Sequence, residues 1–162
     1  QIIARMQKFA AQMLEAKNIE LFFEADEKLK SLKVPLQYRS DLFMIFKEAI
    51  NNLAKYSNAT NAWIVLHKSN KSFFLEIKDD GVGFDKQQTA NGNGLRNMRE
   101  RAENLGGKLT ILSEKDKGTK IILEFGTMWK VSFNKVVALC WIEIIKYKSV
   151  PKQVRDKLCK NV

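Results

Sequence analysis

The 162-residue chain has few cysteines, prolines and histidines: two, two and one. Cys140 and Cys159 provide neither a disulfide framework nor the spacing of a zinc site, so a reducing compartment is expected. No apolar run approaches the roughly 20 residues that a membrane-spanning helix needs. Gln1 opens on an amphipathic pattern rather than on a signal peptide. We therefore expect a cytoplasmic domain, whose parent protein could still be anchored in a membrane by another segment.

A strong excess of one charge is missing from most of the chain. The net charge is +10, yet residues 126–162 alone hold eight basic and two acidic side chains, whereas residues 1–125 hold 20 and 16. The basic excess is therefore concentrated near the end, and no basic stripe of the kind that marks nucleic-acid binding crosses the first part. No direct nucleic-acid partner is expected. The hydrophobic fraction of 45% is that of a globular domain with one core.

Apolar periodicity predicts helices that alternate with strands. The connection at 28–33 is polar, and residues 79–94 contain four glycines, which is typical of a mobile loop. This order predicts an α+β fold, a two-layer α/β sandwich in which helices cover one face of a mixed sheet. The expected helices span residues 2–16, 35–56 and 95–105, and the expected strands span residues 18–25, 62–67, 73–77, 109–112 and 120–125.

The predicted helix from Asp41 to Tyr56 has an apolar and a polar face. At 100° per residue, the polar side chains opposite the apolar face are Glu48, Asn52, Lys55 and Tyr56. An amide oxygen suits Mg²⁺, a lysine suits phosphate, and a tyrosine ring suits a base or ribose. An ordinary helix also has a solvated polar face, which is the commoner explanation for this pattern alone.

Three glycine-containing segments follow in order. Asp79-Asp80-Gly81-Val82-Gly83 comes after a strand, where a carboxylate can accept a hydrogen bond from an exocyclic amine and glycines allow close approach of the backbone. Gly92-Asn93-Gly94-Leu95 precedes a helix, whose N-terminus favours anions. Gly118-Thr119 opens the last strand, where a hydroxyl could bond a carboxylate or a water. Each segment alone is also an ordinary turn or loop. Their fixed order within one architecture favours a nucleotide site.

These motifs resemble those of the Bergerat-fold ATPases, the group of gyrase, the ninety-kilodalton heat-shock chaperone, MutL and the histidine kinases. Within this group the chain resembles the catalytic domain of sensor histidine kinases, especially the NarX/DesK-like branch. The stretches that carry the resemblance are residues 46–57 (N box), 79–84 (G1 box), 92–102 (G2 box) and 118–121 (last glycine box). The resemblance implies three parts: residues 1–17 as the end of a dimerisation helix, 18–125 as the ATPase catalytic domain, and 126–162 as a basic aromatic tail.

The resemblance also implies roles for single residues. Asn52 would ligate a Mg²⁺ that bridges the ATP phosphates, and Glu48 would support the metal-bound water or polarise the reacting group. Lys55 would contact phosphate, and Tyr56 would pack beside the nucleotide. The residues implied around adenine and the lid are Asp79 for the adenine amine, Thr119 assisting through water, Gly81 and Gly83 for close backbone approach, and Gly92 and Gly94, followed by Leu95, as hinges of a lid over residues 84–93.

The implied activity is that of a protein-histidine kinase, which transfers the γ-phosphate of ATP to a histidine on a dimerisation domain absent from this chain. The implied partners are that domain, a response regulator downstream and, for the parent protein, a second copy of itself. His67 lies in a strand pattern, so we expect a structural role for it. Two alternatives stay open: a serine kinase of the anti-sigma type, and a nucleotide-binding regulatory module without enzymatic activity. The box after Gly92 and the initial helix favour the sensor kinase.

Overall fold

A computed structural model describes residues 2–29, 34–69, 72–85 and 93–126. The order of its elements is the predicted one, and none of the helices in these ranges combines the length and apolar character needed to cross a bilayer. The elements are α1 (Ile2–Glu15), β1 (Glu20–Ala25), the 3-10 turn η1 (Glu27–Leu29), α2 (Leu36–Tyr56), β2 (Asn61–Ser69), β3 (Ser72–Asp79), α4 (Asn93–Asn104), β4 (Lys108–Ser113) and β5 (Thr119–Gly126). Apart from Gly126, the predicted tail lies outside the described residues.

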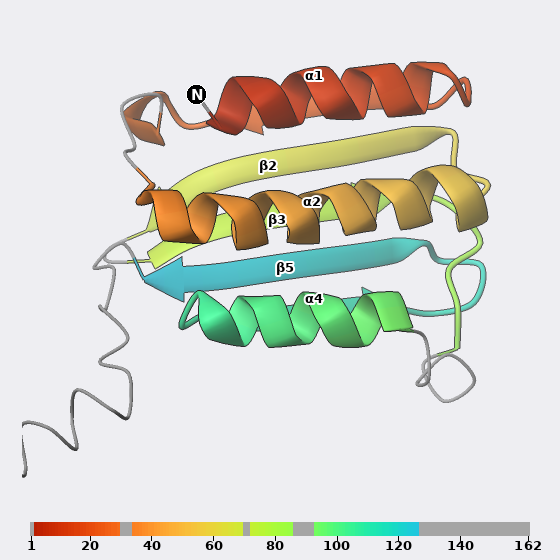
Figure 1. Ribbon diagram of the computed structural model, residues 1–162. Coiled ribbons are helices and arrows are strands. Elements are labelled where there is room, and N and C mark those ends of the chain that lie inside the picture. The colour runs from red at the N-terminus through yellow and green to blue at the C-terminus, as the bar shows by residue number, and fades with distance from the viewer. Residues whose placement is uncertain (1, 30–33, 70–71, 86–92, 127–162) are drawn as a thin grey trace, which may run out of the picture. The chain divides into compact units, whose positions relative to one another are not determined.

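The five strands of the described residues form one sheet in the order β1-β2-β3-β5-β4. β1 pairs with β2 in parallel, and the other neighbours are antiparallel, so the sheet is mixed. Figure 1 shows α1, α2 and α4 over the same face of the sheet, with α2 between the other two. The predicted two-layer α+β sandwich is therefore confirmed.

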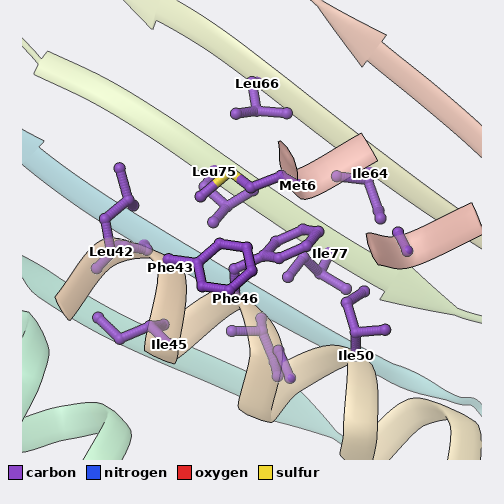
Figure 2. Close-up of a cluster of buried hydrophobic side chains, with 14 of the residues drawn as sticks. Met6, Leu42, Phe43, Ile45, Phe46, Ile50, Ile64, Leu66, Leu75 and Ile77 are labelled. Atoms are coloured by element: carbon purple, nitrogen blue, oxygen red, sulfur yellow. The ribbon is translucent and has the colours of Figure 1, made fainter. Parts of the chain in front are cut away.

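Burial alternates along the strands and identifies the covered face. In β2, Ala62, Ile64 and Leu66 are buried, whereas the residues between them are partly exposed. The same alternation in β3 brings Asp79 to the helix side. Figure 2 shows Phe46 of α2 lying among side chains of the neighbouring strands, and its side chain is completely buried. The core thus fills the space between α2 and the middle of the sheet.

Helix α1 belongs to this same core. Phe9 packs edge-on against Phe43 of α2, with ring centroids 5.9 Å apart. The core of the described residues is continuous on both sides of residue 17, so the predicted boundary there does not correspond to a break in packing. That α1 also continues a dimerisation helix stays a prediction. The α1 residues with no exposed surface are Met6, Ala10 and Leu14.

The segment after β1, predicted to be a polar connection, begins with the turn η1. Leu29 is only 1% exposed, and its N–H donates to the Asp26 carbonyl at 2.8 Å. One apolar residue among lysines creates no periodicity, so no local pattern predicts this turn. Burial of the Leu29 side chain anchors the segment to the core.

The single histidine lies where the sequence predicts it, inside β2. Its ring stacks on Phe74 of β3, with centroids 4.9 Å apart and an interplanar angle of 7°. Because Leu66 points into the core, the adjacent His67 points to the sheet face that the helices do not cover.

Candidate functional site

A cavity of about 610 Å³ is bounded by residues of α2, α4 and the strands β3, β4 and β5. This volume lies within the usual range for sites that bind small ligands. Much of its wall is apolar, including Leu53, Ile77, Ile111 and Ile121. The predicted site residues that line it are Glu48, Asn52, Tyr56, Asp79, Gly83, Gly94, Leu95 and Thr119.

Two other predicted residues are described but stand outside this lining, Lys55 and Gly81. The lining residues Glu48, Asn52 and Tyr56 recur every four positions and form one line along α2. Lys55 is rotated by about 100° from its neighbour Tyr56 and is exposed. Gly92 and most of the predicted lid fall outside the described residues.

Asp79 provides a buried carboxylate at the sheet end of the cavity, with only 5% of the residue exposed. Its Oδ1 accepts the N–H of Gly81 at 2.9 Å, and the backbone N–H of Thr119 also donates to the carboxylate. Burial raises the pKa of Asp79 and the charge of Asp80 adds to this, while the two N–H groups oppose it. Its remaining lone pairs can accept a hydrogen bond from a ligand amine.

The adjacent Asp80 has a different role, which the sequence did not reveal. Its Oδ1 accepts the N–H groups of Thr60 and Asn61, both at 2.9 Å, and its Oδ2 accepts the Asn61 side-chain amide at 2.8 Å. The hydrogen bonds from Asn61 lower the pKa of Asp80. Asp80 therefore fastens the end of β3 to the start of β2. Its partners lie about twenty residues upstream, and no local motif signals such a contact.

The glycines of the G1-like segment allow tight passage of the backbone. A Cβ at Gly81 would overlap the Ser57 carbonyl, which accepts the N–H of Val82 at 2.7 Å. Gly83 has a φ of +58°, and a Cβ there would overlap the Glu114 carbonyl. The segment is thus held between the C-terminus of α2 and the β4–β5 turn.

The helix end of the cavity combines oxygen ligands with a helix N-terminus. Glu48 and Asn52, one turn apart on α2, both line it. The Glu48 carboxylate lies against Gly94, in the first turn of α4, and a Cβ at this position would require the Glu48 side chain to shift. Free backbone N–H groups of a helix start suit phosphate, and amide or carboxylate oxygens suit Mg²⁺.

A Mg²⁺ ion would fit the helix end of the cavity only if a bound ligand supplied some of the coordinating oxygens. Within the described residues, no group of three or more histidine, cysteine or acidic side chains is placed to hold a metal. Mg²⁺ in nucleotide sites is commonly held by one or two side chains together with phosphate oxygens and waters. Asn52 and Glu48 are compatible with that arrangement and not with a metal site made of protein alone.

Ser113 at the end of β4 was not singled out from the sequence. Its Oγ accepts the N–H of Phe84 at 2.9 Å, and lies 3.2 Å from the Gly118 carbonyl and 2.9 Å from the Thr119 hydroxyl. Ser113 and Thr119 are register partners across the β4–β5 hairpin. The predicted hairpin could have suggested this pairing, because both residues flank the turn.

Residues 37–127 match the family of histidine kinase-, DNA gyrase B- and HSP90-like ATPases. The chain belongs to this family of ATPases. By sequence it is 37% identical over 94 residues to the sensor protein VraS of Staphylococcus aureus (strain COL), and equally to that of Staphylococcus haemolyticus (strain JCSC1435). Each alignment covers 57% of this chain and 27% of the relative, so the chain spans about a quarter of the length of these sensor proteins.

Solved structures agree with this fold. The histidine kinase domain of the Erythrobacter litoralis EL346 blue-light activated histidine kinase has a TM-score of 0.64 and 18% identity, and covers 84% of this chain and 64% of its own. The catalytic domain of the histidine kinase ThkA has the same TM-score and identity, over 78% of this chain and 91% of that domain. The fold is therefore that of a histidine kinase catalytic domain.

Proposed function

We propose that this chain is the catalytic domain of a two-component sensor histidine kinase, which transfers the γ-phosphate of ATP to a histidine of a dimerisation domain. The observation that carries this proposal is the cavity itself. It joins the buried carboxylate of Asp79 at one end to Glu48, Asn52 and the start of α4 at the other. The similarity to VraS favours a sensor kinase over the gyrase and chaperone members of the family.

At the sheet end, Asp79 would accept the amino group of adenine, and Thr119 would assist directly or through a water. The apolar side chains of Ile77 and Ile111 line the same cavity and suit the faces of a purine ring. Tyr56 is 70% exposed and would pack beside the nucleotide near the mouth of the cavity.

At the helix end, Asn52 would hold a Mg²⁺ ion together with the phosphates, and Glu48 would bind a metal water or polarise the reacting group. Bound there, Mg²⁺ would supply charge neutralisation for phosphoryl transfer. Lys55 is exposed one turn beyond Asn52 and would contact phosphate from outside the lining. Gly92 and Gly94 would act as hinges of a lid that excludes water when it closes.

The phosphoacceptor has to come from another domain. His67 is stacked on Phe74 on the sheet face opposite the helix layer, whereas the cavity lies on the helix side. The proposed partners are a histidine-bearing dimerisation domain and a response regulator. We further propose that the parent protein is a homodimer and that this domain lies in the cytoplasm.

Two measurements test the proposal. Titration calorimetry should detect ADP and a non-hydrolysable ATP analogue, the latter bound more tightly with Mg²⁺. Radiolabelled ATP should then label a supplied histidine-bearing dimerisation domain on histidine, giving an acid-labile and base-stable product. A folded protein that binds no adenine nucleotide would contradict the assignment. Label on serine would favour the anti-sigma alternative, and binding without any transfer would favour a regulatory module.

A further inference from the structure

We propose that Ser113 is a positioning residue that fixes the hydrogen-bonding direction of Thr119 and thereby contributes to the choice of base. This inference rests on the proposed binding of an adenine nucleotide in the cavity. Ser113 does not line that cavity, but two of its three partners, Phe84 and Thr119, do. Any effect of Ser113 on a ligand must therefore pass through these neighbours.

The contacts of Ser113 leave one consistent assignment of protons. A serine hydroxyl has one proton and two lone pairs. The Phe84 N–H can only donate, and so it takes one lone pair at 2.9 Å. The Gly118 carbonyl can only accept, and so it takes the serine proton at 3.2 Å. The remaining contact, 2.9 Å to the Thr119 hydroxyl, is then a hydrogen bond only if Thr119 donates.

The reverse direction is less favourable. If Ser113 donated to Thr119, its oxygen would face the Gly118 carbonyl at 3.2 Å with no proton between two acceptors. The first assignment turns all three contacts into hydrogen bonds in a partly buried location, where an unmade hydrogen bond costs more than it does at an exposed position. Thr119 therefore gives its proton to Ser113 and keeps only acceptor lone pairs for the cavity.

An acceptor at Thr119 reinforces the acceptor at Asp79. The backbone N–H of Thr119 already donates to the Asp79 carboxylate, so the two residues are neighbours at the base end of the cavity. Two acceptors suit the two hydrogens of a 6-amino group. They oppose a 6-oxo group, which would bring a third acceptor against them. The structure thus gives Ser113 an indirect part in selecting adenine over hypoxanthine or guanine.

The test compares ADP with inosine diphosphate, whose base has a 6-oxo group in place of the amine and a proton on N1. In Ser113→Ala the Thr119 proton is free to turn toward the ligand. ADP should bind about threefold to tenfold more weakly, which corresponds to one hydrogen bond of ordinary strength. Affinity for inosine diphosphate should be unchanged or higher, so the preference for ADP should narrow. Ser113→Thr, which keeps the hydroxyl, should retain the wild-type preference for ADP over inosine diphosphate.

Double substitution tests whether Ser113 acts on the bound base through Thr119. In a Thr119→Val background, Ser113→Ala should no longer change the ratio of the two affinities. Thr110→Ala, which removes a hydroxyl from the same strand but from the uncovered sheet face, should leave the ratio at its wild-type value. If Ser113→Ala does not fold, Ser113→Cys, a poor acceptor of similar size, should narrow the preference in the same way.

Equal weakening of both nucleotides, or additive effects of Ser113→Ala and Thr119→Val on the ratio, would overturn the inference. Such results would leave ADP binding by the wild type intact. A wild type that binds neither nucleotide would instead overturn the proposed function, and the role of Ser113 with it.

Discussion

Arg101 of α4 and Asp41 of α2 form an ion pair, with Nη1 and Oδ1 2.6 Å apart. Gly94 of α4 also lies against the Glu48 side chain of α2. Gly94 precedes the arginine by seven residues, and Glu48 follows the aspartate by seven, so α4 packs antiparallel to α2. The ion pair thus fixes the end of the helix pair that lies two turns away from the cavity.

Removing this ion pair should lower stability modestly. The two side chains are 36% and 21% exposed, so solvent screens the pair in part, and Arg101→Ala should cost about 0.5–1 kcal/mol. Thermal denaturation measures the loss, and an added Asp41→Ala should cost little more. Arg96→Ala is the matched control, because its pair with Glu100 is longer, at 3.6 Å, and both side chains are more than 60% exposed. An equal loss in Arg96→Ala would contradict a special role for the Arg101 pair.

Substitutions at Asp79 and Asp80 should have different effects, the first on ADP affinity and the second on the stability of the fold. Asp79→Asn removes the charge at the base end of the cavity, and ADP affinity in the folded protein should fall roughly tenfold to a hundredfold, the contribution of a charge-assisted hydrogen bond. Asp80→Asn should leave ADP affinity unchanged and lower the free energy of unfolding by about 1 kcal/mol, because three hydrogen bonds to Thr60 and Asn61 are weakened or lost. Calorimetric titration and thermal melts on the same samples measure ADP affinity and stability for both variants. Unchanged ADP affinity in folded Asp79→Asn would contradict the adenine role.

ADP affinity should also depend on pH through Asp79. Burial raises the pKa of this carboxyl above the ordinary value of 3.8, so it takes up a proton at a higher pH than a free aspartate. Protonation removes the charge, and affinity should fall as pH drops toward this raised pKa and be level well above it. Titrations of wild type and Asp79→Asn in parallel isolate the effect, since protonation of the adenine ring affects both. Parallel profiles for the two proteins would exclude Asp79 as the titrating group.

Asn52→Ala should act at the other end of the cavity. It removes the proposed Mg²⁺ ligand, so binding of the Mg²⁺–ATP analogue and phosphoryl transfer should weaken strongly, whereas adenosine should bind as before. Comparing the two ligands with and without Mg²⁺ measures this difference. Asn51→Ala, which removes the neighbouring amide absent from the cavity lining, is the control. Equal losses for adenosine and the ATP analogue would place Asn52 outside the metal site.

Periodic patterns predicted the fold, and together with the glycine-containing motifs they predicted most of the candidate site. Strand alternation and the 100° repeat placed the elements, and Glu48, Asn52 and Tyr56 do line one cavity with Asp79. Periodicity of this kind survives folding, because the same faces that repeat in the sequence are the ones that pack.

Contacts between segments distant in sequence could not be predicted in this way. Lys55 was grouped with Tyr56, although only the structure shows which part of the polar face the cavity reaches. Asp80 owes its role to Asn61 of the neighbouring strand, and Ser113 contacts Phe84, which lies 29 residues upstream. The need for glycine at 81 arises from the Ser57 carbonyl. Such constraints depend on where elements meet, which no local motif encodes.

The base end of the cavity spans the junction of two hairpins. Asp79 ends β3, which pairs with β2 in one hairpin, and Thr119 begins β5, which pairs with β4 in the other. The β3–β5 ladder joins these hairpins, and its partners, such as Lys78 and Lys120, are far apart in sequence. Each hairpin forms by closing a short loop and can form quickly. The β3–β5 ladder forms only when the long chain segment between these two strands closes on itself.

The proposed adenine site therefore forms only when the two hairpins dock, and a chain that still lacks the β3–β5 ladder should not bind the base. ADP should then retard unfolding and leave the refolding rate almost unchanged, as for contacts that form after the transition state. Stopped-flow kinetics at saturating ADP measures both rates. Faster refolding would mean that the two hairpins are already joined when the folding barrier is crossed.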